Sequence, residues 1–355
     1  MCYNRLIIFN KQQITMFQPF KSLLPTHYSY RILNRNSISA VFLALLLSSG
    51  CAKTDSEPLR AALASTRFVA YTPTDLKIIY GQVKPASKDQ ITRDLTVLRN
   101  DFQGLITYSC ADGLEHLPAI AKSQGFTAII LGIWDPMSEV ELTCAKKLVN
   151  EFPDLIVGIS VGNENLLAKR YDWDQLKQAM RKFRSELPGT PVATSEPFYY
   201  YLNDEPADFI AEQDFLLPSI HPLFQPWFEQ GNTASWVNFV VEVMNLLIKK
   251  SDKLILIKES GLPSGPKGSR FSPEQQAGFW VELYQKMPRT PGLNLAYFEG
   301  FDHAWKEENA KVDFKGAHPE EGYWGFYTEA GQPKPVLKAL RKLWQSTAKS
   351  QEAPR

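Results

Sequence analysis

The chain has 355 residues, of which 44% are hydrophobic and 22% charged, a composition typical of a soluble globular protein with a sizeable core. Its formal net charge is +1 and it has no long basic run, so a nucleic-acid partner has no electrostatic support. The length fits either two domains or one α/β barrel of about 250 residues with a leader.

The N-terminal part of the chain has the order of a secretory signal. Arg31 and Arg35 precede the apolar run 40–47, and small residues at 48–50 lead to Cys51. The run is much shorter than the roughly 20 residues that span a bilayer. Its Ser-Ser-Gly-Cys end resembles the lipobox of bacterial lipoproteins. We therefore predict a lipoprotein-type signal over 1–50, lipidation at Cys51 and anchoring of the exported protein to a membrane of the cell envelope. The alternative is ordinary signal cleavage and free secretion.

A polar tether is predicted over 51–65, followed by one folded domain over 66–350. This domain contains Cys110 and Cys144, whose spacing does not decide whether they pair. The five histidines are scattered and no metal-ligand spacing occurs, so we expect neither a metal nor a cofactor. We also expect a monomer.

Short apolar runs alternate with helical patterns along the rest of the chain. The predicted strands are 76–80, 105–108, 127–133, 156–161, 191–194, 214–217, 254–258 and 295–298. The predicted helices are 91–102, 114–124, 140–149, 173–187, 235–250, 273–286 and 336–344. Continuous apolar strands suit a sheet that is buried on both faces. The alternation predicts the α/β class and a (β/α)8 TIM barrel, and no nucleotide-binding glycine motif follows any strand.

Two predicted strands end in a carboxylate. Strand 156–161 leads into Glu164 and strand 254–258 leads into Glu259. A single such glutamate is more often a solvent-facing residue, but two at equivalent strand ends favour function, because βα loops carry the active site of a barrel. Paired carboxylates cleave glycosidic bonds, one as general acid/base and the other as nucleophile in the retaining version. Asn163 is placed to bind the sugar 2-hydroxyl.

These segments resemble motifs of glycoside hydrolase family 17, the β-1,3-glucanases. The run 158–164 (Gly-Ile-Ser-Val-Gly-Asn-Glu) is similar to the acid/base motif, and 257–264 (Ile-Lys-Glu-Ser-Gly-Leu-Pro-Ser) to the nucleophile motif. The runs 219–224 and 297–306 resemble two further motifs. The resemblance covers about 76–340 and implies a barrel, a retaining mechanism, Glu164 as acid/base, Glu259 as nucleophile and no metal.

The sequence departs from the family pattern at three of these positions. Leu262 replaces a tryptophan, Ser219 replaces an asparagine, and His303 stands where the family has a glutamate near the catalytic centre. The last change bears on the charge around Glu259, but both principal carboxylates are retained.

Further substrate-binding candidates lie at or just after strand ends. They are Tyr108, Trp134, Tyr199, His221, Phe224, Asp302, Trp305 and Lys306. Aromatic rings stack on pyranose faces, although such residues also pack beneath loops. By resemblance, Tyr108 bonds Glu259 or the substrate and Lys306 lines the cleft. Asp302 and Glu299 are either cleft residues or structural ion-pair partners.

The sequence therefore predicts a retaining hydrolase of laminarin-like β-1,3-glucan. A transglycosylase is a near alternative, because it uses the same catalytic residues. A non-catalytic glucan-binding surface lipoprotein is a second alternative that the change at His303 supports and the two carboxylates oppose.

Overall fold

The computed structural model describes residues 56–79, 81–313 and 318–352. The predicted signal over 1–50 and the predicted lipidation site Cys51 lie outside the described residues.

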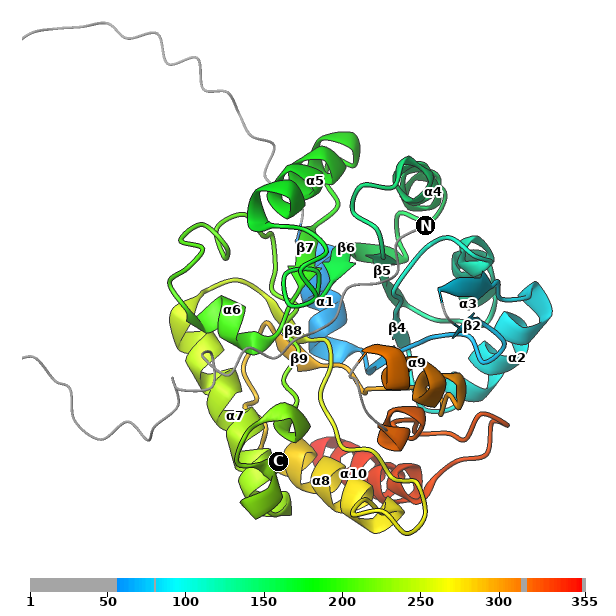
Figure 1. Cartoon of the computed structure of the whole chain (residues 1–355), viewed down its shortest axis with the longest axis vertical. Helices are drawn as coiled ribbons and strands as arrows, with labels where there is room; N and C mark the ends of the chain where they lie inside the picture. Colours follow the sequence, from blue (N-terminus) through cyan, green and yellow to red (C-terminus); the bar gives the residue numbers. More distant parts are fainter. Residues whose placement is uncertain (1–55, 80, 314–317, 353–355) are drawn as a thin grey trace, which may run out of the picture. The chain divides into compact units, whose positions relative to one another are not determined.

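Parallel strands form the centre of the fold (Figure 1). Five of them are hydrogen-bonded in the order β1 (Phe68–Ala70), β4 (Gly104–Ile106), β5 (Ala128–Ile133), β6 (Ile156–Asn163) and β7 (Val192–Ser195). A second parallel pair consists of β8 (Ile255–Ile257) and β9 (Leu293–Leu295).

Residues 214–219 and Tyr297 close this sheet into a barrel. The amide of Asp214 donates to Val192 O at 2.9 Å, and the amide of Leu256 donates to Leu216 O at 2.9 Å, so 214–219 joins β7 to β8. At the other edge, the amide of Tyr297 donates to Phe68 O at 2.9 Å, which joins the end of β9 to β1. The predicted (β/α)8 barrel is confirmed, with its sixth strand reduced to isolated bridges.

Helices surround the strands (Figure 1). They are α2 (Lys88–Leu98), α3 (Leu117–Ser123), α4 (Glu139–Glu151), α5 (Trp173–Glu186), α6 (Phe198–Leu202), α7 (Thr233–Lys250), α8 (Pro273–Lys286), α9 (Trp305–Asp313) and α10 (Pro335–Glu352). Several begin at a residue whose side chain accepts a hydrogen bond from the amide three residues on, which satisfies one of the free N–H groups of the first turn. Examples are Ser138 before α4, Asp172 before α5 and Asn232 before α7.

Two predictions at the start of the domain are wrong. The first barrel strand is β1, whereas the predicted strand 76–80 contributes β2 (Lys77–Ile79), which forms an antiparallel hairpin with β3 (Gln82–Lys84) outside the barrel sheet. The side chains of β3 are exposed, so this hairpin lacks the burial of a barrel strand. The predicted tether also contains helix α1 (Glu57–Ser65), which begins with a proline in its first turn and buries Leu59 and Leu63.

Helix α1 covers the amino end of the barrel. Its buried leucines join a cluster of side chains that fills the barrel interior, including Phe68, Ile130 and Leu256. The side-chain amide of Asn294 donates to Leu63 O and Thr66 O, both at 2.9 Å, and so satisfies carbonyls at the end of the helix. A second apolar layer lies between the strands and the outer helices.

The two cysteines of the domain are neighbours and both are free thiols. Cys144 on α4 directs its Sγ to the carbonyl oxygen of Cys110 at 2.7 Å.

Within residues 56–79, 81–313 and 318–352, none of the helices has the length and apolarity that a membrane crossing requires.

Candidate active site

Glu164 and Glu259 both lie at the carboxyl end of the barrel strands. Glu164 follows β6 directly, and its amide donates to Ser195 O on neighbouring β7 at 2.7 Å. Glu259 follows β8, and its carbonyl accepts the amide of Ile220 at 2.8 Å. Backbone bonds to adjacent strands therefore hold both glutamates at the barrel mouth, where βα loops meet.

The backbone before Glu164 has an unusual conformation. The register between β6 and β7 shifts after Ser160, and Gly162 has φ 82°. A Cβ atom at Gly162 would come within 2.0 Å of Asn165 Nδ2, so only glycine fits. Glu164 itself has φ 50°, a region that non-glycine residues seldom occupy and that often marks functional positions.

Hydrogen-bonding groups surround the Glu259 carboxylate. Tyr108, after β4, donates its hydroxyl to Oε1 at 2.8 Å, and His221 Nε2 lies 3.4 Å from Oε2. Burial acts to raise the pKa of Glu259, but the bond with His221, the charge of Lys258 and the bond from Tyr108 outweigh it and lower the pKa. Glu259 is therefore an ionised carboxylate at neutral pH, the state that a nucleophile requires.

Glu164 has the opposite shift. It is half-buried and accepts one hydrogen bond, from Ser219 Oγ to Oε1 at 3.0 Å. Burial and the negative charge of Glu259 raise its pKa, against the opposing influence of His221 and Ser219. Two carboxyl groups whose surroundings shift their pKa values apart have the arrangement of an acid and a nucleophile in a glycosidase.

Asn163 is held by two cationic side chains. Lys258 Nζ donates to Asn163 Oδ1 at 2.6 Å, and the Arg170 guanidinium donates to the Asn163 carbonyl. Lys258 is 1% exposed, and its ammonium lies 4.3 Å from the centroid of the Tyr108 ring. Sequence reasoning did not select Lys258, although a lysine at the end of an apolar strand was a signal of a buried charge.

Two further strand ends carry buried carboxyl groups, in addition to the two strand ends from which the catalytic pair was predicted. Glu196 follows β7, is fully buried and accepts the amide of Leu166 at 3.0 Å. Burial raises its pKa to about 8. Glu299 follows β9 and is also fully buried. Glu196 was missed because it stands two residues after the end of the predicted strand 191–194, whereas Glu299 was already a candidate for the cleft or for an ion pair.

Glu299 forms an ion pair with Lys306, and the negative charge of Glu259 also acts on it. Lys306 Nζ lies 2.6 Å from both carboxylate oxygens of Glu299. Burial raises the pKa of Glu299 to about 7, in opposition to Lys306. His303 is fully buried with Nε2 3.7 Å from Glu299 Oε2, and burial lowers its pKa well below the usual range. At the position where the family has a glutamate, this chain therefore has the neutral ring of His303, and the adjacent carboxylate is that of Glu299.

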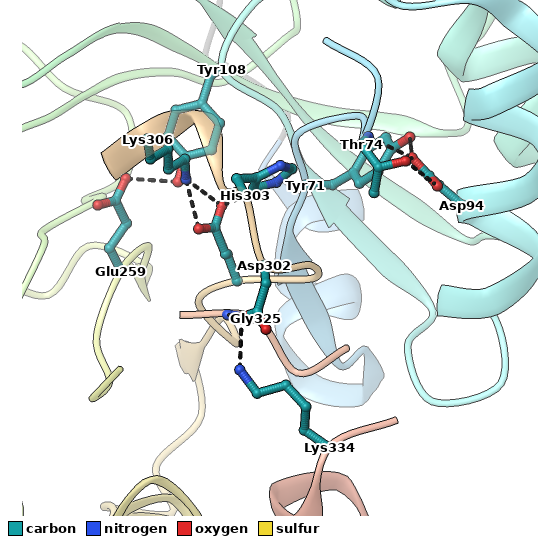
Figure 2. A network of polar contacts seen from close by, with 11 residues as sticks. Tyr71, Thr74, Asp94, Tyr108, Glu259, Asp302, His303, Lys306, Gly325 and Lys334 are labelled. Atoms are coloured by element: carbon teal, nitrogen blue, oxygen red, sulfur yellow. Dashed lines mark hydrogen bonds and ion pairs between the residues drawn. The ribbon is translucent and has the colours of Figure 1, made fainter. Parts of the chain in front are cut away.

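The structure separates Asp302 from this group. Its Oδ1 accepts from Lys334 Nζ at 2.7 Å and from the amide of Gly325 at 2.9 Å, on the side of the loop away from Glu259 (Figure 2). Of the two roles considered for Asp302, these contacts favour the structural ion-pair partner over substrate binding.

The aromatic candidates differ in how much of each ring is exposed. Phe224 is 44% exposed and packs edge-on to His221, with centroids 5.6 Å apart. Tyr199, at the start of α6, is half-buried and stacks at a tilt on Tyr200. Trp134 is half-buried beneath the Arg170 guanidinium, which lies 4.4 Å from its ring centroid. Trp305 is half-buried beside His303. Phe224 offers the most open ring for a sugar.

In the part of the chain that the structure describes, His, Cys, Asp and Glu side chains form no group of three or more that is arranged to hold a metal ion.

A (β/α)8 barrel with an acid and a carboxylate at two strand ends is the architecture of a glycoside hydrolase. Residues 69–325 match the BtgE/BtgC glycoside hydrolase domain, and the chain belongs to this family. It is 26% identical over 299 residues to a glucan 1,3-beta-glucosidase of Arthroderma benhamiae, a match that covers 79% of this chain and 95% of that protein.

Two solved structures share the fold. One is an endo-laminarinase from Formosa Hel1_33_131, with TM-score 0.60 and 16% identity over 78% of this chain and 86% of that chain. The other is a glycoside hydrolase family 17 beta-1,3-glucanosyltransferase from Rhizomucor miehei, with TM-score 0.55 and 18% identity over 76% of this chain and 95% of that chain. Together with the family match and the glucan 1,3-beta-glucosidase relative, these neighbours bear out the resemblance to glycoside hydrolase family 17.

Proposed function

We propose that this protein is a retaining hydrolase of β-1,3-glucan, with Glu164 as general acid/base and Glu259 as nucleophile. The observation that carries the proposal is geometric: Tyr108 and His221 contact the Glu259 carboxylate at the barrel mouth, and Ser219 bonds Glu164. Their surroundings lower the pKa of Glu259, while burial and the charge of Glu259 raise the pKa of Glu164. Glu164 protonates the leaving oxygen while Glu259 attacks the anomeric carbon. Glu164 then takes a proton from water, which hydrolyses the glycosyl-enzyme.

The choice of linkage is supported by the relatives. The similar protein of Arthroderma benhamiae is a glucan 1,3-beta-glucosidase, and the Formosa structure is an endo-laminarinase. The open ring of Phe224 and the half-buried ring of Tyr199 provide apolar faces near the carboxyl pair on which a glucose unit can stack.

The test is incubation of the purified protein with laminarin and laminarihexaose, with products resolved by chromatography. We expect shorter oligosaccharides, and loss of most of the rate in Glu164→Ala and Glu259→Ala. Glu186→Gln is the matched control, because Glu186 forms an exposed ion pair with Lys146 at the far end of α5. Intact substrate together with tight laminarin binding would support the non-catalytic alternative instead.

The same experiment separates hydrolysis from transglycosylation, because the Rhizomucor relative in fold is a glucanosyltransferase. Products longer than laminarihexaose would mean that a second sugar, rather than water, accepts the glycosyl group. Products that are only shorter support the hydrolase.

We infer that the mature protein is a monomer attached to a cell-envelope membrane through lipid on Cys51, as the lipobox-like end of the predicted signal indicates. Cys51→Ser is expected to move the protein from the membrane to the soluble exported fraction. Equal distribution of the parent and this variant would favour free secretion.

A further inference from the structure

Lys258 is a buried cation that the two-carboxylate mechanism leaves without a role. It follows the apolar strand β8, directly precedes Glu259 and is 1% exposed. A buried ammonium is unfavourable unless other groups pair with it. The partners of Lys258 therefore indicate what retains it at this position.

These partners connect Lys258 to both halves of the site. Its Nζ donates to Asn163 Oδ1 at 2.6 Å, and Asn163 is the residue that precedes Glu164. The same ammonium lies 4.3 Å from the centroid of the Tyr108 ring, whose hydroxyl donates to Glu259. One side chain thus contacts the neighbours of the acid and of the nucleophile.

Charge around the ammonium comes from several strand ends. Burial lowers the pKa of Lys258 to about 8, and Glu259, Glu164 and Glu196 act in the opposite direction. Lys258 in turn lowers the pKa of Glu164 and that of Glu259. His221, from the loop after 214–219, lowers both as well, while Glu299 adds negative charge at Tyr108.

We propose that Lys258 is a positioning residue, which fixes the Asn163 amide for the sugar 2-hydroxyl and supplies positive charge to both catalytic carboxyl groups. The proposal rests on the proposed function for its reaction. A contact to the 2-hydroxyl strengthens in the transition state, so its loss lowers kcat more than it raises KM.

Lys258→Met retains most of the length of the side chain and removes its charge. We expect kcat on laminarihexaose to fall about 10- to 100-fold, the scale of a lost hydrogen bond to a charged group. Without the cation both carboxyl groups hold their protons to higher pH. In the pH–rate profile, the acidic limb reports ionisation of Glu259 and the alkaline limb reports ionisation of Glu164. Both limbs should move upward by roughly one pH unit.

Two controls isolate these effects. Lys253→Met changes a half-buried lysine just before β8 at the opposite end of the barrel, where Nζ donates to Ile210 O at 2.8 Å. It should leave both pH limbs in place. Asn163→Ala tests positioning, because Lys258→Met should cost much less activity when Asn163 has already been removed.

The effect of the Lys258 charge on the two carboxyl groups can also be measured without substrate. In protein labelled with ¹³C at glutamate carboxyl carbons, assigned through Glu164→Gln and Glu259→Gln, Lys258→Met should raise the pKa of both groups. Thermal unfolding checks that the variant is folded, and Lys258→Gln serves if it is not. Inactivity of the parent on glucan would refute the proposed function alone. Unchanged titration of both carboxyl groups, or lost activity with both limbs in place, would refute the role of Lys258.

Discussion

The two ends of the barrel differ in polarity: the amino end is apolar and the carboxyl end holds charged side chains. At the amino end, α1 places Leu59 and Leu63 over an apolar interior, and Asn294 satisfies the carbonyls that end the helix. At the carboxyl end, Lys258 and Glu259 are buried beside the half-buried Glu164.

Unsatisfied polar atoms sharpen this contrast. Among the described residues, buried side-chain atoms without a hydrogen-bond partner include Asn165 Nδ2, Ser195 Oγ and Ser260 Oγ, all beside strand ends at the barrel mouth. Buried polar groups of this kind reduce the free energy of unfolding. The amino end therefore stabilises the fold, and the carboxyl end gives up stability for reactivity.

The largest effect is expected at the nucleophile. Glu259→Ala should lower kcat by roughly 10⁴-fold or more, the scale of loss when a covalent nucleophile is removed. Azide that enters the vacated space should restore some turnover of an activated aryl glucoside and give the α-glycosyl azide. A β-glycosyl azide would show that Glu259 is not the nucleophile.

Loss of the general acid should come next. Glu164→Gln is expected to lower the rate on laminari-oligosaccharides about 10²- to 10⁴-fold, and much less on substrates whose leaving group needs no proton. Because the pKa of Glu164 is raised and that of Glu259 lowered, the parent profile should be bell-shaped, with the alkaline limb absent in the variant. A retained alkaline limb would assign it to another group.

Changes at the amino end should affect stability alone. Leu59→Ala removes a fully buried side chain from α1, and we expect it to lower the free energy of unfolding by about 2–5 kcal/mol. Activity per folded molecule should not change, as measured by denaturant unfolding together with laminarihexaose turnover. A large loss of kcat at full folding would contradict the separation of the two ends.

At the carboxyl end, by contrast, a substitution that removes activity should increase stability. A raised folded-state pKa means that the folded protein binds the Glu164 proton more tightly than the unfolded chain, so stability falls as pH rises from the ordinary value to the folded one. Glu164→Gln should therefore raise the free energy of unfolding by about 1 kcal/mol at neutral pH and have little effect near pH 3. Denaturant melts at both pH values test this, and destabilisation at neutral pH would contradict it.

The smallest effect is expected at the rim of the site. Phe224→Ala removes an open ring worth about 1 kcal/mol in stacking, so KM should rise roughly fivefold with little change in kcat or stability. Steady-state kinetics with oligosaccharides of increasing length checks this. An unchanged KM for every length would remove Phe224 from the sugar-binding surface.

Much of the barrel and the two main carboxylates could be predicted from sequence, because the ends of apolar strands such as β5 and β6 can be located from the apolar runs themselves. Glu164 and Glu259 were located by that logic, and the expected bond of Tyr108 to Glu259 is present at 2.8 Å. The start of the domain was misassigned because the apolar run 76–80 lies close to β1 in the sequence and was predicted as the first barrel strand, whereas it forms the hairpin strand β2.

The remaining site residues depend on tertiary contacts. The partners of Glu196 and Lys258 come from other strand ends, so the contacts of both residues follow only from the folded barrel. The pairing of Asp302 with Lys334 joins residues 32 positions apart, beyond the reach of local patterns. The fold is therefore more predictable from sequence than the charge network that it creates.

The most direct test of the central claim is the anomeric configuration of the first product. Double displacement through Glu259 inverts the anomeric carbon twice, so ¹H NMR during early laminarihexaose cleavage should show the β-anomer first, followed by slow mutarotation. If the α-anomer forms first, the reaction is a single displacement by water, and Glu259 is a general base rather than a nucleophile.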